Sequence, residues 1–262
     1  MSFAVSLGFC PLGSGSKGNS VFLRTAKTRV LIDAGLSALA IEQRLEELAV
    51  DIATIQAILV THEHIDHIRA IAIFSEKYKI PVFANGETAK GICSVLQMRP
   101  RFKIFTTGEP FTFEDLLIDP FSIPHDAFDP VAFIIKIGIL KIGFCTDLGH
   151  VTSCIRKKLE QCDYLYLEAN HQISMVHACN RPMTYKQRVL GKLGHLSNEE
   201  CASLLEAIAH PGLKHVYLAH LSSECNSPAS LFQMIQTVCK KENLLPKLSI
   251  ALQEKISHPI FF

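Results

Sequence analysis

Residues Thr61 to His67 read Thr-His-Glu-His-Ile-Asp-His, which places three histidines and an aspartate within six residues. The stretch directly follows Ala57 to Val60, a short aliphatic run that is typical of a buried strand. The alternating His-x-His can aim two imidazoles at one point, and the aspartate and last histidine then serve a second point in the following turn. Imidazole nitrogens and carboxylate oxygens are the usual ligands of zinc and of harder transition ions. The stretch therefore predicts a metal site at a strand end.

The bulk composition is that of an ordinary globular protein. The chain has 262 residues, 48% hydrophobic and 19% charged, which is enough for an ample core in one domain over residues 1–262. Its net charge of +1 means that any nucleic-acid substrate must be held by local basic groups. The nine cysteines form no C-x-x-C pair, which favours a reducing, cytoplasmic setting over a disulfide framework.

No membrane segment or secretory signal is expected. The longest apolar region, Val131 to Cys145, is interrupted by Lys136 and Lys141, which argues against a membrane span. No Lys or Arg precedes Lys17, so the N-terminal apolar stretch lacks the charged start of a signal peptide. We therefore expect no membrane partner.

A glycine-rich loop, Gly13 to Ser20, follows a strand expected over Phe3 to Phe9. It contains a literal G-x-G-x-x-G, the fingerprint of dinucleotide-binding folds, but that fold needs a helix directly after the glycines. Two β-rich runs follow instead, Ser20 to Arg24 and Thr28 to Asp33, and they indicate a hairpin. We therefore reject the nucleotide-binding interpretation. Glycines let a substrate approach the backbone, so the loop contributes three candidate substrate contacts, Ser14, Ser16 and Asn19.

Strand and helix signals alternate along the rest of the chain and predict a layered α/β architecture. Helices are expected over residues 41–48, 68–78, 86–98 and 229–240. Strands are expected over residues 80–84, 131–137, 140–146, 162–167, 215–222 and 248–253, the last finishing the fold. Residues 111–121 are expected to form a strand pair or a loop. The clearest helix begins after Ser197, which forms a capping box with Glu200. His195 lies just before this helix, close to its partial positive end.

Four further polar residues follow apolar runs, as the first histidine of the metal stretch does: His125, Asp147, Glu168 and His220. With these placed, the chain resembles the metallo-β-lactamase superfamily from end to end. The metal stretch matches its H-x-H-x-D-H motif, and Leu31 to Gly35 resembles its first motif. The YycJ/WalJ subfamily is the most similar, on Gly13 to Ser20 and on the segments 124–127, 146–149, 168–171, 194–198 and 218–222. The histidine before a helix, working with a glutamate, also resembles the RNase Z nucleases.

The resemblance implies an α+β fold, a four-layer αββα sandwich with a dinuclear metal centre at the shared edge of its two sheets. It implies that the first ion is held by His62, His64 and His125, and the second by Asp66, His67 and His220, with Asp147 bridging. Asp33 would fix the stretch from Thr61 to His67 through hydrogen bonds. The ions would be two divalent cations, zinc or manganese, and iron is also compatible with such ligands.

The chemistry follows from the ligands. Two divalent ions about 3.5–4 Å apart lower the pKa of a shared water towards roughly 7 and neutralise a scissile phosphate, so the nucleophile is a hydroxide that bridges them. Asp66 is counted with the catalytic residues. A nuclease also needs a proton donor for the leaving oxygen, and we assign it to His195, kept protonated and oriented by Glu168. Lys186 and Arg188 keep the family's basic spacing and are candidate phosphate contacts, although a solvated helix face explains them equally well.

The leading functional hypothesis is a metal-dependent phosphodiesterase that acts on nucleic acid, with a DNA exonuclease favoured by analogy with the YycJ group. An RNA-processing nuclease is next. A small-molecule hydrolase of the same fold, which opens a cyclic phosphodiester, a thioester or a lactam, is the alternative with a different substrate. A non-catalytic binding module is expected to have lost metal ligands, and every expected ligand is present in the sequence.

Overall fold

The computed structural model of the chain describes residues 7–241, 244 and 246–262. The strand expected over Phe3 to Phe9 therefore lies mostly outside the described residues. The chain divides into two compact units. The first unit comprises Met1–Pro120, Ala127–Val131 and Leu252–Phe262, and the second comprises Phe121–Asp126 and Ala132–Ala251. The expectation of one domain over the whole chain stays a prediction.

The first unit contains a mixed seven-stranded sheet in the order β14-β1-β2-β3-β4-β5-β6. Its strands are β1 (Gly8–Gly13), β2 (Ser20–Arg24), β3 (Arg29–Ile32), β4 (Ala57–Leu59), β5 (Val82–Ala84), β6 (Phe102–Ile104) and β14 (Ile260–Phe261). The predicted hairpin is confirmed, since β2 and β3 pair antiparallel with Arg24 opposite Arg29. From β3 to β6 the pairing is parallel, so the carboxyl ends of these strands lie at one edge. The sequence analysis missed β6 and the two-residue β14, and it was wrong to end the fold at residue 253.

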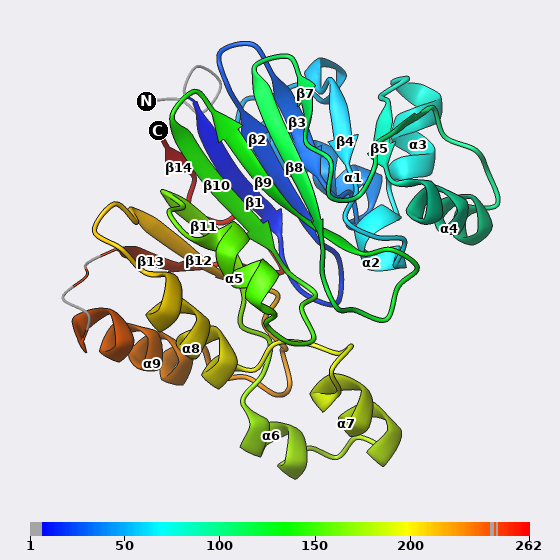
Figure 1. Cartoon of the computed structure of the whole chain (residues 1–262). Coiled ribbons are helices and arrows are strands. Elements are labelled where there is room, and N and C mark those ends of the chain that lie inside the picture. The colour runs from blue at the N-terminus through cyan, green and yellow to red at the C-terminus, as the bar shows by residue number, and fades with distance from the viewer. Residues whose placement is uncertain (1–6, 242–243, 245) are drawn as a thin grey trace. The chain divides into compact units, whose positions relative to one another are not determined.

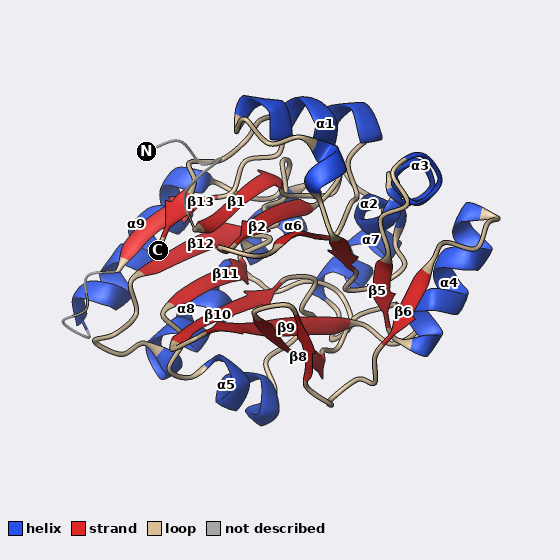
Figure 2. Ribbon diagram, turned by 90° about the horizontal axis from the view of Figure 1, so that it is seen from above, coloured by secondary structure: helices blue, strands red, loops and turns tan. Residues whose placement is uncertain are grey.

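Four helices accompany this sheet: α1 (Ala38–Glu47), α2 (Ile65–Ile68), α3 (Ile71–Lys77) and α4 (Gly86–Leu96). Ser37 caps α1 by accepting the Ala40 N–H, and the buried Ile41 and Leu45 join the core of the unit. Figure 2 shows α4 alongside β5 and β6. The helices predicted over residues 41–48 and 86–98 are thus confirmed.

The helix predicted over residues 68–78 is confirmed as α3, but α3 begins only at Ile71, because the helical bonding is interrupted after the short helix α2. The interruption lies where the segment after β3 contacts residues 61–67, called the metal loop below. The Ala34 N–H donates to the His67 carbonyl oxygen, and the Ala70 N–H donates to the Ala34 carbonyl oxygen. These hydrogen bonds to Ala34 take the place of hydrogen bonds within a helix. The periodic apolar residues therefore continue through the segment, although the helix is interrupted.

Gly35 makes the close approach of these two segments possible. A Cβ atom at Gly35 would lie 1.5 Å from the Asp66 carbonyl oxygen, so one of the two main chains would have to shift. We expect Gly35→Ala to destabilise the protein by about 3 kcal/mol or more, which lowers Tm by roughly 6–12 °C. Gly86→Ala is the matched control, because a Cβ there meets nothing within 4 Å. A thermal unfolding scan in which the two variants melt together would contradict this reading of the loop.

The strands of the second unit follow the order β13-β12-β11-β10-β9. Their bounds are β9 (Val131–Ile137), β10 (Leu140–Cys145), β11 (Tyr164–Glu168), β12 (His215–Ala219) and β13 (Lys247–Ile250). The antiparallel β9–β10 hairpin confirms the prediction, and β10 to β13 are parallel. Of the strand pair or loop expected over residues 111–121, the structure has the strand pair, as β7 (Phe111–Phe113) and β8 (Leu116–Ser122), and the chain passes from the first unit to the second within β8.

Five helices connect these strands: α5 (Ser153–Leu159), α6 (Ile173–Ala178), α7 (Met183–Leu190), α8 (Asn198–Ile208) and α9 (Pro228–Lys241). Figure 1 shows α8 and α9 side by side, and their apolar faces pack with α5 into the core of this unit. The capping box of Ser197 and Glu200 on α8 is present as predicted. Among the described residues, no helix is both long enough and apolar enough to cross a membrane.

Candidate metal centre

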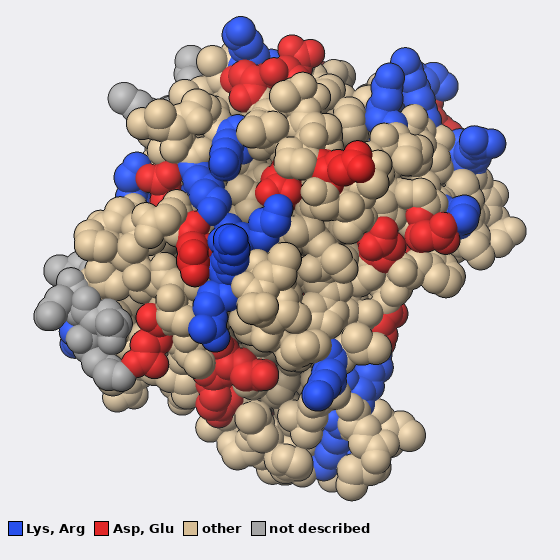
Figure 3. All heavy atoms as spheres, viewed as in Figure 1, with Lys and Arg blue, Asp and Glu red and all other residues tan. Residues whose placement is uncertain are grey.

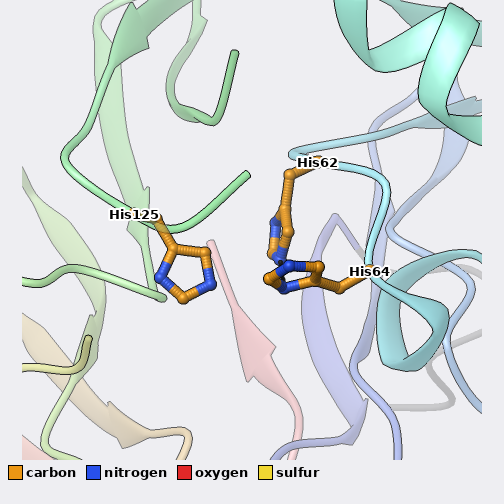
Figure 4. A group of neighbouring side chains, drawn as sticks. All are labelled: His62, His64 and His125. Carbon is orange, nitrogen blue, oxygen red and sulfur yellow. Dashed lines mark hydrogen bonds between the residues drawn. The ribbon is translucent and has the colours of Figure 1, made fainter. Parts of the chain in front are cut away.

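In the first unit, the chain leaves β4 and immediately presents the histidines of the metal loop, residues 61–67. His62 is fully buried, and its Nε2 lies 3.0 Å from Nδ1 of His64. Figure 4 shows these two rings turned towards each other from the loop that follows β4. Two ring nitrogens at this separation point at one spot, as two ligands of one cation do.

Asp33 fixes the tautomers of two histidines of this loop. Its Oδ2 accepts the Nδ1–H of His67 at 2.8 Å and the Thr61 hydroxyl at 2.9 Å. Because that hydroxyl proton is committed to Asp33, the hydroxyl oxygen accepts the Nδ1–H of His62, 2.9 Å away. Both histidines therefore carry their lone pair on Nε2, the form in which imidazole binds a metal.

Asp66 and His67 form a second group of possible metal ligands in this loop. Oδ2 of Asp66 lies 3.7 Å from Nε2 of the buried His67. The amide nitrogen of Asn19, from the glycine-rich loop, lies 3.0 Å from the same Nε2. Of the other two residues proposed from that loop, Ser14 is buried and Ser16 is exposed. The structure thus brings Asn19 to the metal loop, and substrate contact by these three residues stays a prediction.

Replacing Asp33 with asparagine is expected to weaken metal binding about 10–100-fold. Asparagine keeps an oxygen for the Thr61 N–H but presents an NH₂ donor to the Thr61 hydroxyl. The hydroxyl then donates to Nδ1 of His62 and moves its proton to Nε2, the nitrogen that should bind the metal. Competition with a chromogenic chelator measures the affinity. Asp51→Asn, which changes an acid that caps a short 3-10 turn, is the control and should bind metal as the wild type does.

In the second unit, Glu168 at the end of β11 organises the site. The side chain is fully buried, and its Oε1 accepts hydrogen bonds from Nδ1 of both His195 and His220, each at 2.9 Å. Its Oε2 accepts the main-chain N–H groups of Leu148 and Leu196 at 2.6 and 3.2 Å. Burial raises the pKa of this carboxyl, but the charges and hydrogen bonds of the two histidines outweigh burial and lower it to about 2. An ionised carboxylate therefore orients both rings.

Asp147 follows β10 and lies among three histidines. Its Oδ1 is 3.4 Å from Nδ1 of His220, 3.7 Å from Nδ1 of His195 and 3.9 Å from Nε2 of His125. The Nδ1–H of His125 donates to the Gly194 carbonyl oxygen at 3.1 Å, which leaves Nε2 as the lone-pair nitrogen. Burial lowers the pKa of His125, although the charge of Asp147 opposes this, and neutral imidazole is the metal-binding form.

Three of the proposed site residues have a strained backbone. Asp33, Asp147 and His220 have φ angles of 59°, 57° and 55°, in the left-handed region that glycine prefers. Each lies within two residues of a strand end. A non-glycine residue in this region costs roughly 1–3 kcal/mol and persists where the surrounding structure requires the side chain. The strain therefore supports a functional role for these three residues.

A pocket of about 480 Å³ lies beside His195 in the second unit. Its lining includes the basic residues His150, His171 and Lys192 and the acidic residues Glu199 and Glu200. Burial lowers the pKa of His171 to about 4, so this ring is neutral at physiological pH. The pocket thus leaves open space next to the His195 side chain.

The basic residues of α7 already have partners within the second unit. Nζ of Lys186 donates to the His177 carbonyl oxygen at 2.6 Å, and the Arg188 guanidinium forms an ion pair with Asp126 at 2.6 Å. Figure 3 shows a group of Lys and Arg side chains over the region of α7. Phosphate contact by these two residues stays a prediction.

Sequence reasoning missed two features of the site. It predicted that Glu168 orients His195 but not that the same oxygen holds His220, because nothing in the sequence relates residues so far apart. It also left Glu63 out, although this charged residue stands between two expected ligands. Glu63 is buried and accepts the Phe128 N–H at 2.9 Å. A charged residue inside a motif, next to an apolar strand, was the signal available.

Comparison with known proteins identifies the relatives of the chain. Residues 28–221 match the family model of the "Beta-lactamase superfamily domain". The chain is 33% identical over 224 residues to "Exodeoxyribonuclease YycJ" of Bacillus anthracis, covering 85% of each chain. It is 35% identical over 219 residues to "Exodeoxyribonuclease WalJ" of Streptococcus pneumoniae, covering 82% of this chain and 81% of the relative.

A solved structure supports the fold. The metallo-beta-lactamase fold protein YhfI from Bacillus subtilis matches with a TM-score of 0.73 and 16% identity, over 96% of this chain and 99% of that protein. With two mixed sheets and their flanking helices in the structure, this match confirms the expected fold class. The His/Asp/Glu clusters described above are consistent with a binuclear metal site.

Proposed function

Since the chain belongs to the beta-lactamase superfamily and is a hydrolase of the metallo-β-lactamase fold, we propose that it is a metal-dependent exonuclease that cleaves DNA. Two relatives of similar length, both named exodeoxyribonucleases, support DNA as the substrate. The observation that carries the proposal is the buried Glu168, whose single Oε1 holds both His195 and His220. One carboxylate thereby ties an expected metal ligand to a residue suited to proton transfer.

We propose that the chain binds two divalent ions, zinc or manganese. His62, His64 and His125 would hold the first ion, Asp66, His67 and His220 the second, and Asp147 would bridge them. The donor chemistry fits, because hydrogen bonds to Nδ1 direct the lone pair of His62, His67 and His125 to Nε2. When bound, such a pair of ions lowers the pKa of a shared water towards roughly 7 and neutralises charge on the phosphate.

The protein's own groups supply the proton step. In this proposal His195 donates a proton to the leaving oxygen of the scissile phosphodiester, while Glu168 holds the ring by its Nδ1–H and leaves Nε2 for the substrate. The pocket beside His195 accepts the departing nucleotide. Glu168 also fixes the loops that carry Leu148 and Leu196, so the donor and its surroundings are positioned together.

An exonuclease assay tests the proposal. The purified protein is loaded with Mn²⁺ or Zn²⁺ and incubated with single- and double-stranded DNA and RNA, each labelled in turn at the 5′ and the 3′ end. We expect DNA to be shortened in single-nucleotide steps, with RNA cleaved more slowly and all cleavage abolished by EDTA. Faster cleavage of RNA would favour the RNA-processing alternative. No cleavage of any of these substrates, with hydrolysis of a thioester, lactam or cyclic phosphodiester, would contradict the proposal.

A further inference from the structure

Phe128 is an exposed aromatic residue on a backbone segment that is fixed to the metal loop. Its side chain is 70% exposed, whereas large apolar residues are usually buried. It lies in the segment Ala127–Val131, which belongs to the first unit together with the metal loop. We propose that Phe128 is the surface on which an unpaired base of the substrate strand stacks, which rests on the nuclease function proposed above.

Two main-chain hydrogen bonds join this segment to residues on either side of His62. The Phe128 N–H donates to Oε1 of the buried Glu63 at 2.9 Å, and the Val131 N–H donates to the Thr61 carbonyl oxygen at 3.0 Å. Glu63 stands between two expected metal ligands in the sequence. The Phe128 main chain is therefore held one hydrogen bond away from the metal loop.

Asp129 anchors the same segment from the other side. Its carbonyl oxygen accepts the side-chain N–H of Asn85 at 2.7 Å and the hydroxyl of Thr88 at 3.3 Å. Its carboxylate accepts the Thr107 hydroxyl at 2.8 Å. Since Asn85 also caps α4, the segment is fixed to the start of that helix as well as to the metal loop.

The Phe128 ring rests on α4 at Gly91. A Cβ atom on Gly91 would lie 2.9 Å from Cδ2 of Phe128 and 2.6 Å from Cγ of Glu63, so the absence of a side chain lets the helix approach both. The ring is thus supported on one side while most of it remains accessible. A supported, accessible ring loses little conformational freedom when a flat ligand covers it.

A nucleobase is the ligand whose chemistry suits this ring. Stacking of a base on an aromatic side chain is sequence-tolerant, because every base has a π-face, and contributes about 1–3 kcal/mol. An exonuclease must accept any base next to the bond it cleaves. In this proposal, a strand end whose phosphate lies at the metal loop has its unpaired bases near the Phe128 ring, since Glu63 of that loop holds the Phe128 main chain.

The test compares Phe128→Ala and Phe128→Trp on two single-stranded DNA oligonucleotides. One oligonucleotide is normal, and the other has abasic residues at the two terminal positions of each end. On the normal strand, Phe128→Ala should raise KM by about 5–150-fold, and Phe128→Trp should restore the wild-type value. On the abasic strand the wild type should already show the raised KM, and Phe128→Ala should raise it no further. Ile104→Ala, which removes another exposed apolar side chain of the first unit, should leave KM unchanged.

Three results would overturn the stacking role. KM on the normal strand is unchanged in Phe128→Ala, or Phe128→Ala raises KM equally on both strands, or its bound metal falls below the wild-type content. A wild-type protein that forms dimers through this residue, separated by Phe128→Ala in gel filtration, would also overturn it. In each of these cases the wild type still cleaves DNA and the proposed function stands. If the wild type cleaves no DNA, the proposed function fails and this inference fails with it.

Discussion

Replacing Asp147 with asparagine is expected to deplete the bound metal and to lower kcat/KM on DNA at least about 10³-fold. The carboxylate oxygen of Asp147 lies within 3.9 Å of ring nitrogens of three histidines, and we propose that it bridges the two ions. Asparagine tolerates the left-handed φ of 57° at this position, so the backbone keeps its conformation while the charge is lost. Metal analysis by mass spectrometry and steady-state kinetics measure the two effects.

Asp163→Asn is the control for this experiment. Asp163 also belongs to the second unit, where it accepts the Lys141 N–H and forms a partly exposed ion pair with Lys214. The loss of such a pair changes stability by about 0–1 kcal/mol and should leave metal content and rate unchanged. An Asp147→Asn protein that retains two metal ions and wild-type activity would show that this residue bridges nothing.

Replacing His195 with alanine should lower kcat about 10²–10⁴-fold, the usual contribution of a general acid, with the metal content unchanged. His195 is held by Glu168 at 2.9 Å and is not among the proposed ligands. A substrate with a good leaving group, such as a p-nitrophenyl phosphodiester of thymidine, needs no proton donor and should be hydrolysed by the variant almost as fast as by the wild type. This difference between substrates separates proton donation from a structural role.

His177→Ala is the matched control, because His177 is an exposed histidine of α6 in the same unit and does not line this pocket. It should retain most of the wild-type kcat on both substrates. If His195→Ala loses metal, or slows both substrates equally, His195 is a ligand or a structural residue and the assigned role is wrong.

The sequence predicted the parts of the molecule in which one local pattern is enough. The metal loop carries its expected ligands within six residues, the β2–β3 and β9–β10 hairpins alternate around tight turns, and α8 has a capping box ahead of an apolar stripe. Local pattern failed for α7, because Val189 is its only buried residue and no stripe marks it. It also missed the start of α3, where hydrogen bonds to Ala34 of another segment interrupt a continuous apolar stripe.

In the site, too, the sequence predicted what local patterns mark and missed what depends on contacts between distant segments. Ligand types and strand-end positions indicated His125, Asp147 and His220, because each follows an apolar run. The interactions that orient these residues depend on contacts between distant segments. Glu168 reaches two histidines and two main-chain N–H groups, and Asp33 sets two tautomers through Thr61 and His67. Neither arrangement has a sequence signature, so only the structure reveals which nitrogen each ring presents.

Anomalous scattering from crystals of the metal-loaded protein tests the central claim most directly. The account predicts two metal peaks per chain, about 3.5–4 Å apart, with Asp147 contacting both. A single peak, or two ions that Asp147 does not contact, would contradict it.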